Sequence, residues 1–167
     1  MLLCLLLGGC SSISDDDGVE ERIVVGDRVP VFTVSVVADG ETTTFSTAHL
    51  TGETVIVFFH TSCSDCQREL PELNAYYLQH RDEAGFQMVA ISRGERDDTV
   101  APFWAEHGLQ IPYSAQADRS IYDLFASSVI PRVYFVSAQG IVTKVLVENF
   151  DLLISYKKAF ANRKQLK

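Results

Sequence analysis

The sequence has few basic residues, few cysteines and no internal repeat. Its 167 residues include 14 Lys and Arg against 22 Asp and Glu, a formal charge of -8. No basic cluster could follow a phosphate backbone, so nucleic acid is not an expected partner. Because nothing repeats and 47% of the residues are hydrophobic, we expect one domain that can bury a core.

The four cysteines are too few for a disulfide framework, because Cys4 and Cys10 lie in an apolar leader. Only Cys63 and Cys66 remain in the body of the chain. A bond between them would close a loop too small to constrain the unfolded chain by much, whereas such a pair suits reversible electron exchange. We therefore expect a redox pair rather than a structural disulfide, and no cofactor beyond these two sulfur atoms.

The leader contains no long hydrophobic run. Residues 2–7 are apolar but too few to span a bilayer as a mature helix, and they are typical of a secretory signal. Leu7-Gly8-Gly9-Cys10 resembles the lipobox of bacterial lipoproteins, in which the cysteine is acylated and becomes the new N-terminus. No Lys or Arg precedes the run, which departs from the usual signal. The alternative is a disordered apolar terminus with a chance cysteine.

The lipobox resemblance implies a location and a division of the chain. Residues 1–10 would be the signal peptide and lipobox, residues 11–22 an acidic flexible tether, and residues 23–167 the folded domain. Lipidated Cys10 would anchor that domain in the cell envelope. It would face the periplasm or the extracellular side, where disulfides are chemically possible.

Strand-like and helix-like segments alternate through the body. Strands are expected over residues 29–37, 42–45, 54–59, 86–91, 133–136 and 141–147, with a hairpin turn at Asp39-Gly40. Helices are expected over residues 64–83, 97–107, 120–126 and 151–164, with a helical turn at 46–50 and a kink at Pro71. Strands separated by helices, with a closing antiparallel hairpin, favour an α/β sandwich with a mixed sheet.

Cys63-Ser64-Asp65-Cys66 lies between an apolar strand and the start of a helix. Unpaired backbone N–H groups and the positive end of the helix dipole stabilise a thiolate at Cys63. Cys66 lies one turn along the same face, within reach for a disulfide. The negative charge of Asp65 opposes the dipole and favours a reductant, unless its carboxylate points to water and only complements the helix N-terminus.

Several short motifs occur in a fixed order around the cysteines. They are Val29-Pro30-x-Phe32-Thr33, Asp39-Gly40, Leu50-x-Gly52, Cys63-x-x-Cys66, Glu69-Leu70-Pro71, Ile130-Pro131 and Gly140-Ile141-Val142. Together they resemble TlpA/ResA-type thioredoxin-fold proteins over residues 24–147. The resemblance implies a thioredoxin-like three-layer α/β/α sandwich with a mixed central sheet and an N-terminal β-hairpin extension. It also implies an enzyme, a membrane-anchored thiol–disulfide oxidoreductase that works most commonly in the reducing direction.

The resemblance also indicates where a substrate binds. Ile130-Pro131 resembles the cis-proline loop of thioredoxin folds, whose backbone groups pair with an extended substrate segment. Ser62 stands where the family usually has an aromatic residue, and Asp65 stands where it often has proline. We expect Ile130, Pro131 and Ser62 to contact the substrate. We also expect the charge of Arg132 to bias which substrates bind.

The expected chemistry uses three side chains. Cys63 attacks a substrate disulfide, and Cys66 resolves the mixed disulfide by attacking the Cys63 sulfur. Glu69 follows Cys66 by one helical turn, so its carboxylate could take the Cys66 proton, unless it is a solvated surface residue. The expected partners are a disulfide-containing envelope protein as substrate, a membrane-bound thiol as electron donor, and the membrane through lipidated Cys10.

Three other functions stay open. His60-x-x-Cys63-x-x-Cys66 offers three ligands for copper(I) or zinc, as in a metallochaperone, although no fourth ligand is evident nearby. A thiol peroxidase would share the fold, but its nucleophile follows Thr by three residues and Pro by seven, where this chain has His60 and Ile56. The third alternative function is binding alone, by a protein that keeps the fold without the redox chemistry.

Overall fold

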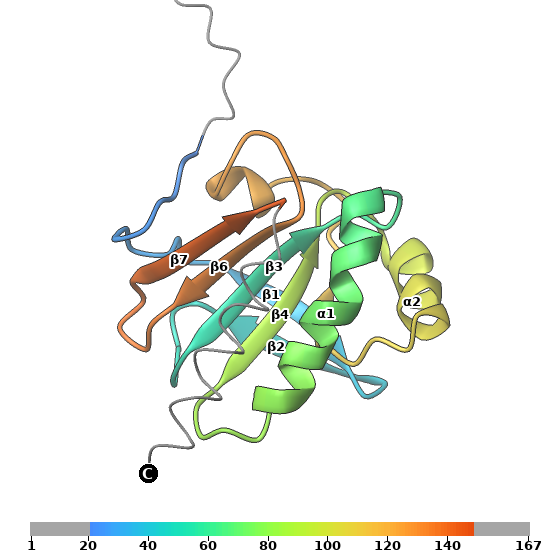
Figure 1. Cartoon of the computed structure of the whole chain (residues 1–167), viewed down its shortest axis with the longest axis horizontal. Helices are drawn as coiled ribbons and strands as arrows, with labels where there is room; N and C mark the ends of the chain where they lie inside the picture. The colour runs from blue at the N-terminus through green and yellow to red at the C-terminus, as the bar shows by residue number, and fades with distance from the viewer. Residues whose placement is uncertain (1–20, 149–167) are drawn as a thin grey trace, which may run out of the picture.

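The computed structural model describes residues 21–148, which form a mixed seven-stranded sheet with helices packed on it (Figure 1). The strands are β1 (Thr33–Ala38), β2 (Glu41–Ser46), β3 (Thr54–Phe59), β4 (Gln87–Ser92), β5 (Tyr113–Ser114), β6 (Arg132–Val136) and β7 (Val142–Val147). The helices are α1 (Ser64–His80), α2 (Asp97–Glu106) and the 3-10 turn η1 (Tyr122–Leu124). The strand order is β2-β1-β5-β4-β3-β6-β7, so the α/β fold with a mixed sheet is confirmed.

Strand β3 lies inside the sheet because it is apolar on both faces. All six of its residues are buried, as expected for a strand covered above and below. It pairs in parallel with β4 and antiparallel with β6. In Figure 1 helix α1 runs beside β4, to the right of the two strands. It buries residues three or four positions apart: Cys66, Glu69, Leu70, Leu73 and Tyr76.

The N-terminal hairpin has the expected turn. Strands β1 and β2 pair antiparallel along their full length, and Asp39 and Gly40 between them have φ of 52° and 81°. Two consecutive residues with positive φ are what a tight two-residue hairpin turn requires. The hairpin joins the rest of the sheet through one residue pair, Val37 with Tyr113 of β5.

Four predicted elements differ from the structure by three residues or more. The strand expected over residues 29–37 begins only at Thr33. In place of a helical turn over residues 46–50, Ser46 ends β2 and residues 47–49 form a turn, in which the Thr47 hydroxyl accepts from the Phe32 N–H (2.9 Å) and donates to the Pro30 carbonyl (2.8 Å). The helix expected over 120–126 is only η1. Helix α1 ends at His80 rather than near Glu83.

Some expectations lie outside the described residues or stay untested. The leader, Cys10, nearly all of the acidic tether and the helix expected over 151–164 lie outside residues 21–148. Helix α1 continues through Pro71, and the kink expected there stays a prediction. Between residues 21 and 148, none of the helices has the length and apolar character needed to span a membrane.

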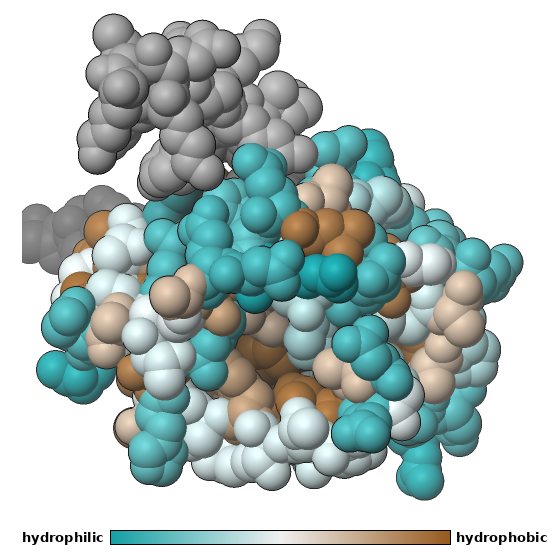
Figure 2. All heavy atoms as spheres, turned by 90° about the horizontal axis from the view of Figure 1, so that it is seen from below, coloured by the Kyte–Doolittle hydropathy of each residue, from teal (hydrophilic) through white to brown (hydrophobic). Residues whose placement is uncertain are grey.

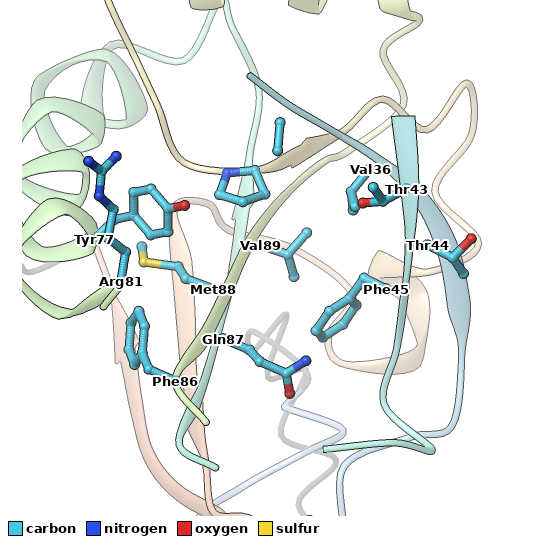
Figure 3. Close-up of a pocket in the computed structure, with 12 residues that line it drawn as sticks. Val36, Thr43, Thr44, Phe45, Tyr77, Arg81, Phe86, Gln87, Met88 and Val89 are labelled. Atoms are coloured by element: carbon cyan, nitrogen blue, oxygen red, sulfur yellow. The ribbon is translucent and has the colours of Figure 1, made fainter. Parts of the chain in front are cut away.

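A cavity of about 230 Å³ lies at the end of the sheet remote from the start of α1. Figure 3 shows Phe45, Tyr77, Phe86 and Met88 around it, from β2, α1 and β4 with its preceding turn. The sheet is open here because β5 has only two residues to bridge β1 and β4. Seen from below, the molecule has a hollow in which hydrophobic side chains are visible (Figure 2).

Candidate active site

Cys63 is the residue that caps the N-terminus of α1. Its backbone is extended (φ -81°, ψ 116°), and its sulfur accepts a hydrogen bond from the Cys66 N–H at 3.3 Å. The sulfur thus occupies the position of an N-cap oxygen, where unpaired N–H groups favour a negative charge. Cys63 is partly exposed, so the nucleophile expected from the sequence is within reach of a substrate.

Cys66 lies beneath Cys63 and is fully buried. Both cysteines are free thiols in this structure. Burial, followed by the hydrogen bond with Cys63, raises the pKa of the Cys66 thiol well above its ordinary value. Cys66 therefore keeps its proton at neutral pH and needs a base before it can attack another sulfur atom.

Glu69, one helical turn after Cys66 on α1, is the residue predicted to act as that base. It is only 4% exposed, so the solvated alternative is wrong. One carboxylate oxygen accepts from Arg68 Nη2 at 3.3 Å, and the other has no hydrogen-bond partner among residues 21–148. Burial raises the pKa of Glu69 to about 7, although Arg68 acts in the opposite direction. A carboxyl with this pKa can accept or return a proton near neutral pH.

The Ile130-Pro131 loop lies against the cysteines, as the resemblance implied. The peptide bond between the two residues is cis, and the Cys63 thiol donates to the Ile130 carbonyl at 3.7 Å. Both side chains are buried, so the loop could meet a substrate only through its backbone. Ser62 is exposed beside Cys63. The substrate contacts of these three residues stay a prediction.

Arg132 does not face the substrate. Its side chain is fully buried and forms an ion pair with Glu21. The expectation that its charge biases the choice of substrate is therefore wrong. Asp65 is also paired, with Arg68 Nη1 2.6 Å from its carboxylate, and its effect on the Cys63 thiolate stays a prediction.

Glu95 is a residue of the site that sequence reasoning missed. It is buried and accepts from the Thr61 N–H (2.8 Å) and the Thr61 hydroxyl (2.5 Å), and His60 Nδ1 lies 3.4 Å from its carboxylate. It thereby holds the segment that leads into Cys63. Its position after β4 was the available signal, because the carboxyl ends of neighbouring parallel strands meet at one edge of the sheet.

His60 does not complete a metal site with the cysteines. Its Nδ1 lies 2.9 Å from the Ser62 hydroxyl and on the same side as Glu95. In the part of the chain that the structure describes, no three His, Cys, Asp or Glu side chains are grouped to hold a metal ion. The metallochaperone alternative therefore gains no support from the geometry.

The model of the AhpC/TSA family matches residues 25–145, most of the chain. The chain belongs to the AhpC/TSA family. Relatives of this AhpC/TSA protein include the thiol-disulfide oxidoreductase ResA of Bacillus subtilis, 28% identical over 76% of this chain and 69% of the relative. ResA of Geobacillus thermodenitrificans is 25% identical over 87% of this chain and 82% of the relative. The resemblance to TlpA/ResA-type proteins is thus confirmed, and this AhpC/TSA protein is a thiol–disulfide oxidoreductase.

A solved structure supports the fold of this AhpC/TSA protein. The thioredoxin domain of a thiol-disulfide oxidoreductase from Bacteroides vulgatus superposes with a TM-score of 0.67 at 19% identity. The match covers 81% of this chain and 97% of that domain. The thioredoxin-like fold is therefore confirmed, including the N-terminal hairpin formed by β1 and β2.

Proposed function

We propose that this oxidoreductase reduces disulfides of envelope proteins while anchored to a membrane through lipidated Cys10. The observation that carries the proposal is the arrangement of three groups at one helix start. Cys63 is accessible, Cys66 is a buried thiol beneath it, and Glu69 is a buried carboxyl with a pKa of about 7. The relatives' names support disulfides as the substrates.

In the first step the Cys63 thiolate attacks one sulfur of a substrate disulfide. The substrate S–S bond breaks, a Cys63–substrate disulfide forms, and the other substrate sulfur leaves and takes up a proton. In the second step Glu69 takes the Cys66 proton, and the Cys66 thiolate attacks the Cys63 sulfur. The Cys63–substrate bond breaks, and the departing substrate thiolate takes up the proton from Glu69. The substrate leaves as a dithiol that has gained two electrons, and a Cys63–Cys66 disulfide remains. A membrane-bound dithiol donor would reduce that disulfide again.

The burial of Cys66 supports the reducing direction. Strong protein oxidants are those whose reduced, thiolate form is stabilised by the fold. Here burial raises the pKa of Cys66, so the fold does not stabilise a thiolate at the resolving position. The reduced cysteine pair therefore tends to donate its electrons to a substrate disulfide.

Single-cysteine variants of the full chain test the proposal. With dithiothreitol as donor and a protein disulfide as substrate, Cys63→Ser should abolish turnover. Prereduced Cys66→Ser, freed of dithiothreitol before the substrate is added, should stop after one step and accumulate a mixed disulfide that intact-mass spectrometry detects. Cys4→Ser serves as the matched control and should keep full activity. Wild-type turnover in either active-site variant would refute the two-cysteine cycle, and a reduction potential near the roughly -120 mV of strong oxidants would refute the direction.

A further inference from the structure

Arg132 is a fully buried cation that directly follows the Ile130-Pro131 loop. Its Nε donates to the carbonyls of Ser128 (3.1 Å) and Val129 (2.9 Å). Its Nη1 donates to both carboxylate oxygens of Glu21, each at 2.7 Å. A buried charge is costly unless it is paired and hydrogen-bonded, so this guanidinium depends on those contacts.

The loop that Arg132 holds has an unusual backbone. Val129 has φ of 66°, in the left-handed region that β-branched residues rarely adopt. Such a conformation persists where the surroundings fix it. The Tyr122 hydroxyl donates to the same two carbonyls, at 2.9 Å to that of Val129. Two buried side chains therefore fix the loop whose next carbonyl, that of Ile130, meets the Cys63 sulfur.

Glu21 reaches Arg132 from the N-terminal segment of the domain. Residue 21 forms a β-bridge with Ala126, and the N–H groups of Arg22 and Ile23 donate to the Phe125 carbonyl at 3.0 and 3.1 Å. The segment is thus fastened to the chain just before the loop. The carboxylate of Glu21 is 34% exposed, so one end of the ion pair lies at the surface.

We propose that Arg132, with Glu21 as its counter-ion, is a positioning residue that fixes residues 128–131 to receive an extended, disulfide-bearing segment of a protein substrate. The inference rests on the proposed function. A loop that is already ordered loses less conformational entropy when a substrate binds. Arg132 should therefore affect the affinity for the substrate rather than the sulfur chemistry. A small disulfide without a peptide backbone would not use the loop.

Two variants of the full chain separate this role from the chemistry. Glu21→Gln removes the counter-charge and changes little else, because the side chain is partly exposed. Arg132→Lys keeps the charge but loses the flat guanidinium that serves carbonyls and carboxylate together. Glu106→Gln and Arg96→Lys are the matched controls, since both residues are exposed on or beside α2. Steady-state kinetics are measured with a peptide disulfide and with a small aromatic disulfide.

We expect KM for the peptide disulfide to rise roughly tenfold in both variants, the effect of losing one charge-assisted contact. We expect kcat, and the rate with the aromatic disulfide, to stay at the control values. An unchanged KM for the peptide overturns the proposal, and so does an equal loss with both substrates, which indicates a merely structural role. Glu21→Gln keeps the test decisive should Arg132→Lys fail to fold. Failure here would leave the loss of turnover in Cys63→Ser untouched, so the proposed function is judged separately.

Discussion

In the proposed cycle, Glu69 is the residue whose protonation state sets the rate of the resolving step. Its carboxyl must be ionised to take the Cys66 proton, and its pKa of about 7 places that change near neutral pH. The rate of the resolving step should therefore rise with pH around 7 in the wild-type protein. Glu69→Gln should lower this rate by roughly 100-fold and remove that part of the pH profile.

Stopped-flow measurement of the resolving step across this pH range checks the prediction. The control is Glu72→Gln, which alters an exposed carboxylate one turn further along α1. A Glu69→Gln variant that keeps the wild-type rate and profile would show that another group accepts the proton.

The same carboxyl affects stability. Because burial raises the pKa of Glu69 from 4.5 to about 7, the folded state keeps a proton that the unfolded state has lost between these pH values. The free energy of unfolding should therefore fall as pH rises from 4.5 to 7, by up to about 3 kcal/mol. Glu69→Gln should remove most of this dependence of the free energy of unfolding on pH. Urea denaturation at several pH values measures this dependence. An equal change of unfolding free energy with pH in the wild-type and variant proteins would contradict the raised pKa of Glu69.

Single residues also show where sequence reasoning ends. Cys63, Cys66 and Glu69 were predicted as site residues because a helix fixes their relative positions through spacing alone. Glu95 contacts a residue 34 positions away, and Arg132 contacts one 111 positions away. No local pattern encodes such contacts. Sequence reasoning therefore expected the charge of Arg132 to act on the substrate, whereas the structure buries it.

At the scale of elements, continuous apolar runs gave the most reliable predictions. The boundaries of β3 were predicted without error, because a run buried on both faces begins and ends abruptly. Strand β5 was missed because its two residues carry no periodicity. The helix expected over 120–126 is only a 3-10 turn, which a sequence pattern separates poorly from a short helix.

The loop before β3 and the turn before β4 approach each other closely at two glycines, Gly52 and Gly85. A Cβ atom on Gly52, before β3, would lie 2.5 Å from the Gly85 carbonyl oxygen in the turn after α1. Both neighbours are backbone, so neither can move aside cheaply. We expect Gly52→Ala to lower the free energy of unfolding by about 2 to 3 kcal/mol, measured by chemical denaturation.

Gly40→Asn is the comparison for this substitution. It changes a hairpin glycine with no atom near its missing Cβ, and asparagine tolerates the positive φ found there. Its effect should be about 1 kcal/mol or less. Equal losses in the two variants would mean that the contact between Gly52 and Gly85 is not the cause.

At the scale of the whole molecule, the proposed anchor decides where the domain works. If Cys10 is acylated, the protein should partition into the membrane fraction of a bacterial host and incorporate labelled fatty acid. Cys10→Ala should move it to the soluble fraction and remove the label, with its in vitro reductase activity unchanged. Cys4→Ala is the control and should leave the label in place. Labelling that survives Cys10→Ala would place the anchor elsewhere.

The single Val37–Tyr113 pair has a further consequence for how this molecule can evolve. The hairpin of β1 and β2 shares one ladder pair with the rest of the sheet, and it turns at Asp39-Gly40, while Cys63 caps α1 after β3. The tip residues Asp39 and Gly40 are exposed, so changes there need not disturb the buried residues of β1 and β2. Substitutions and insertions at the hairpin tip can therefore accumulate, and give the domain new neighbours, while the electron-transfer machinery is inherited unchanged.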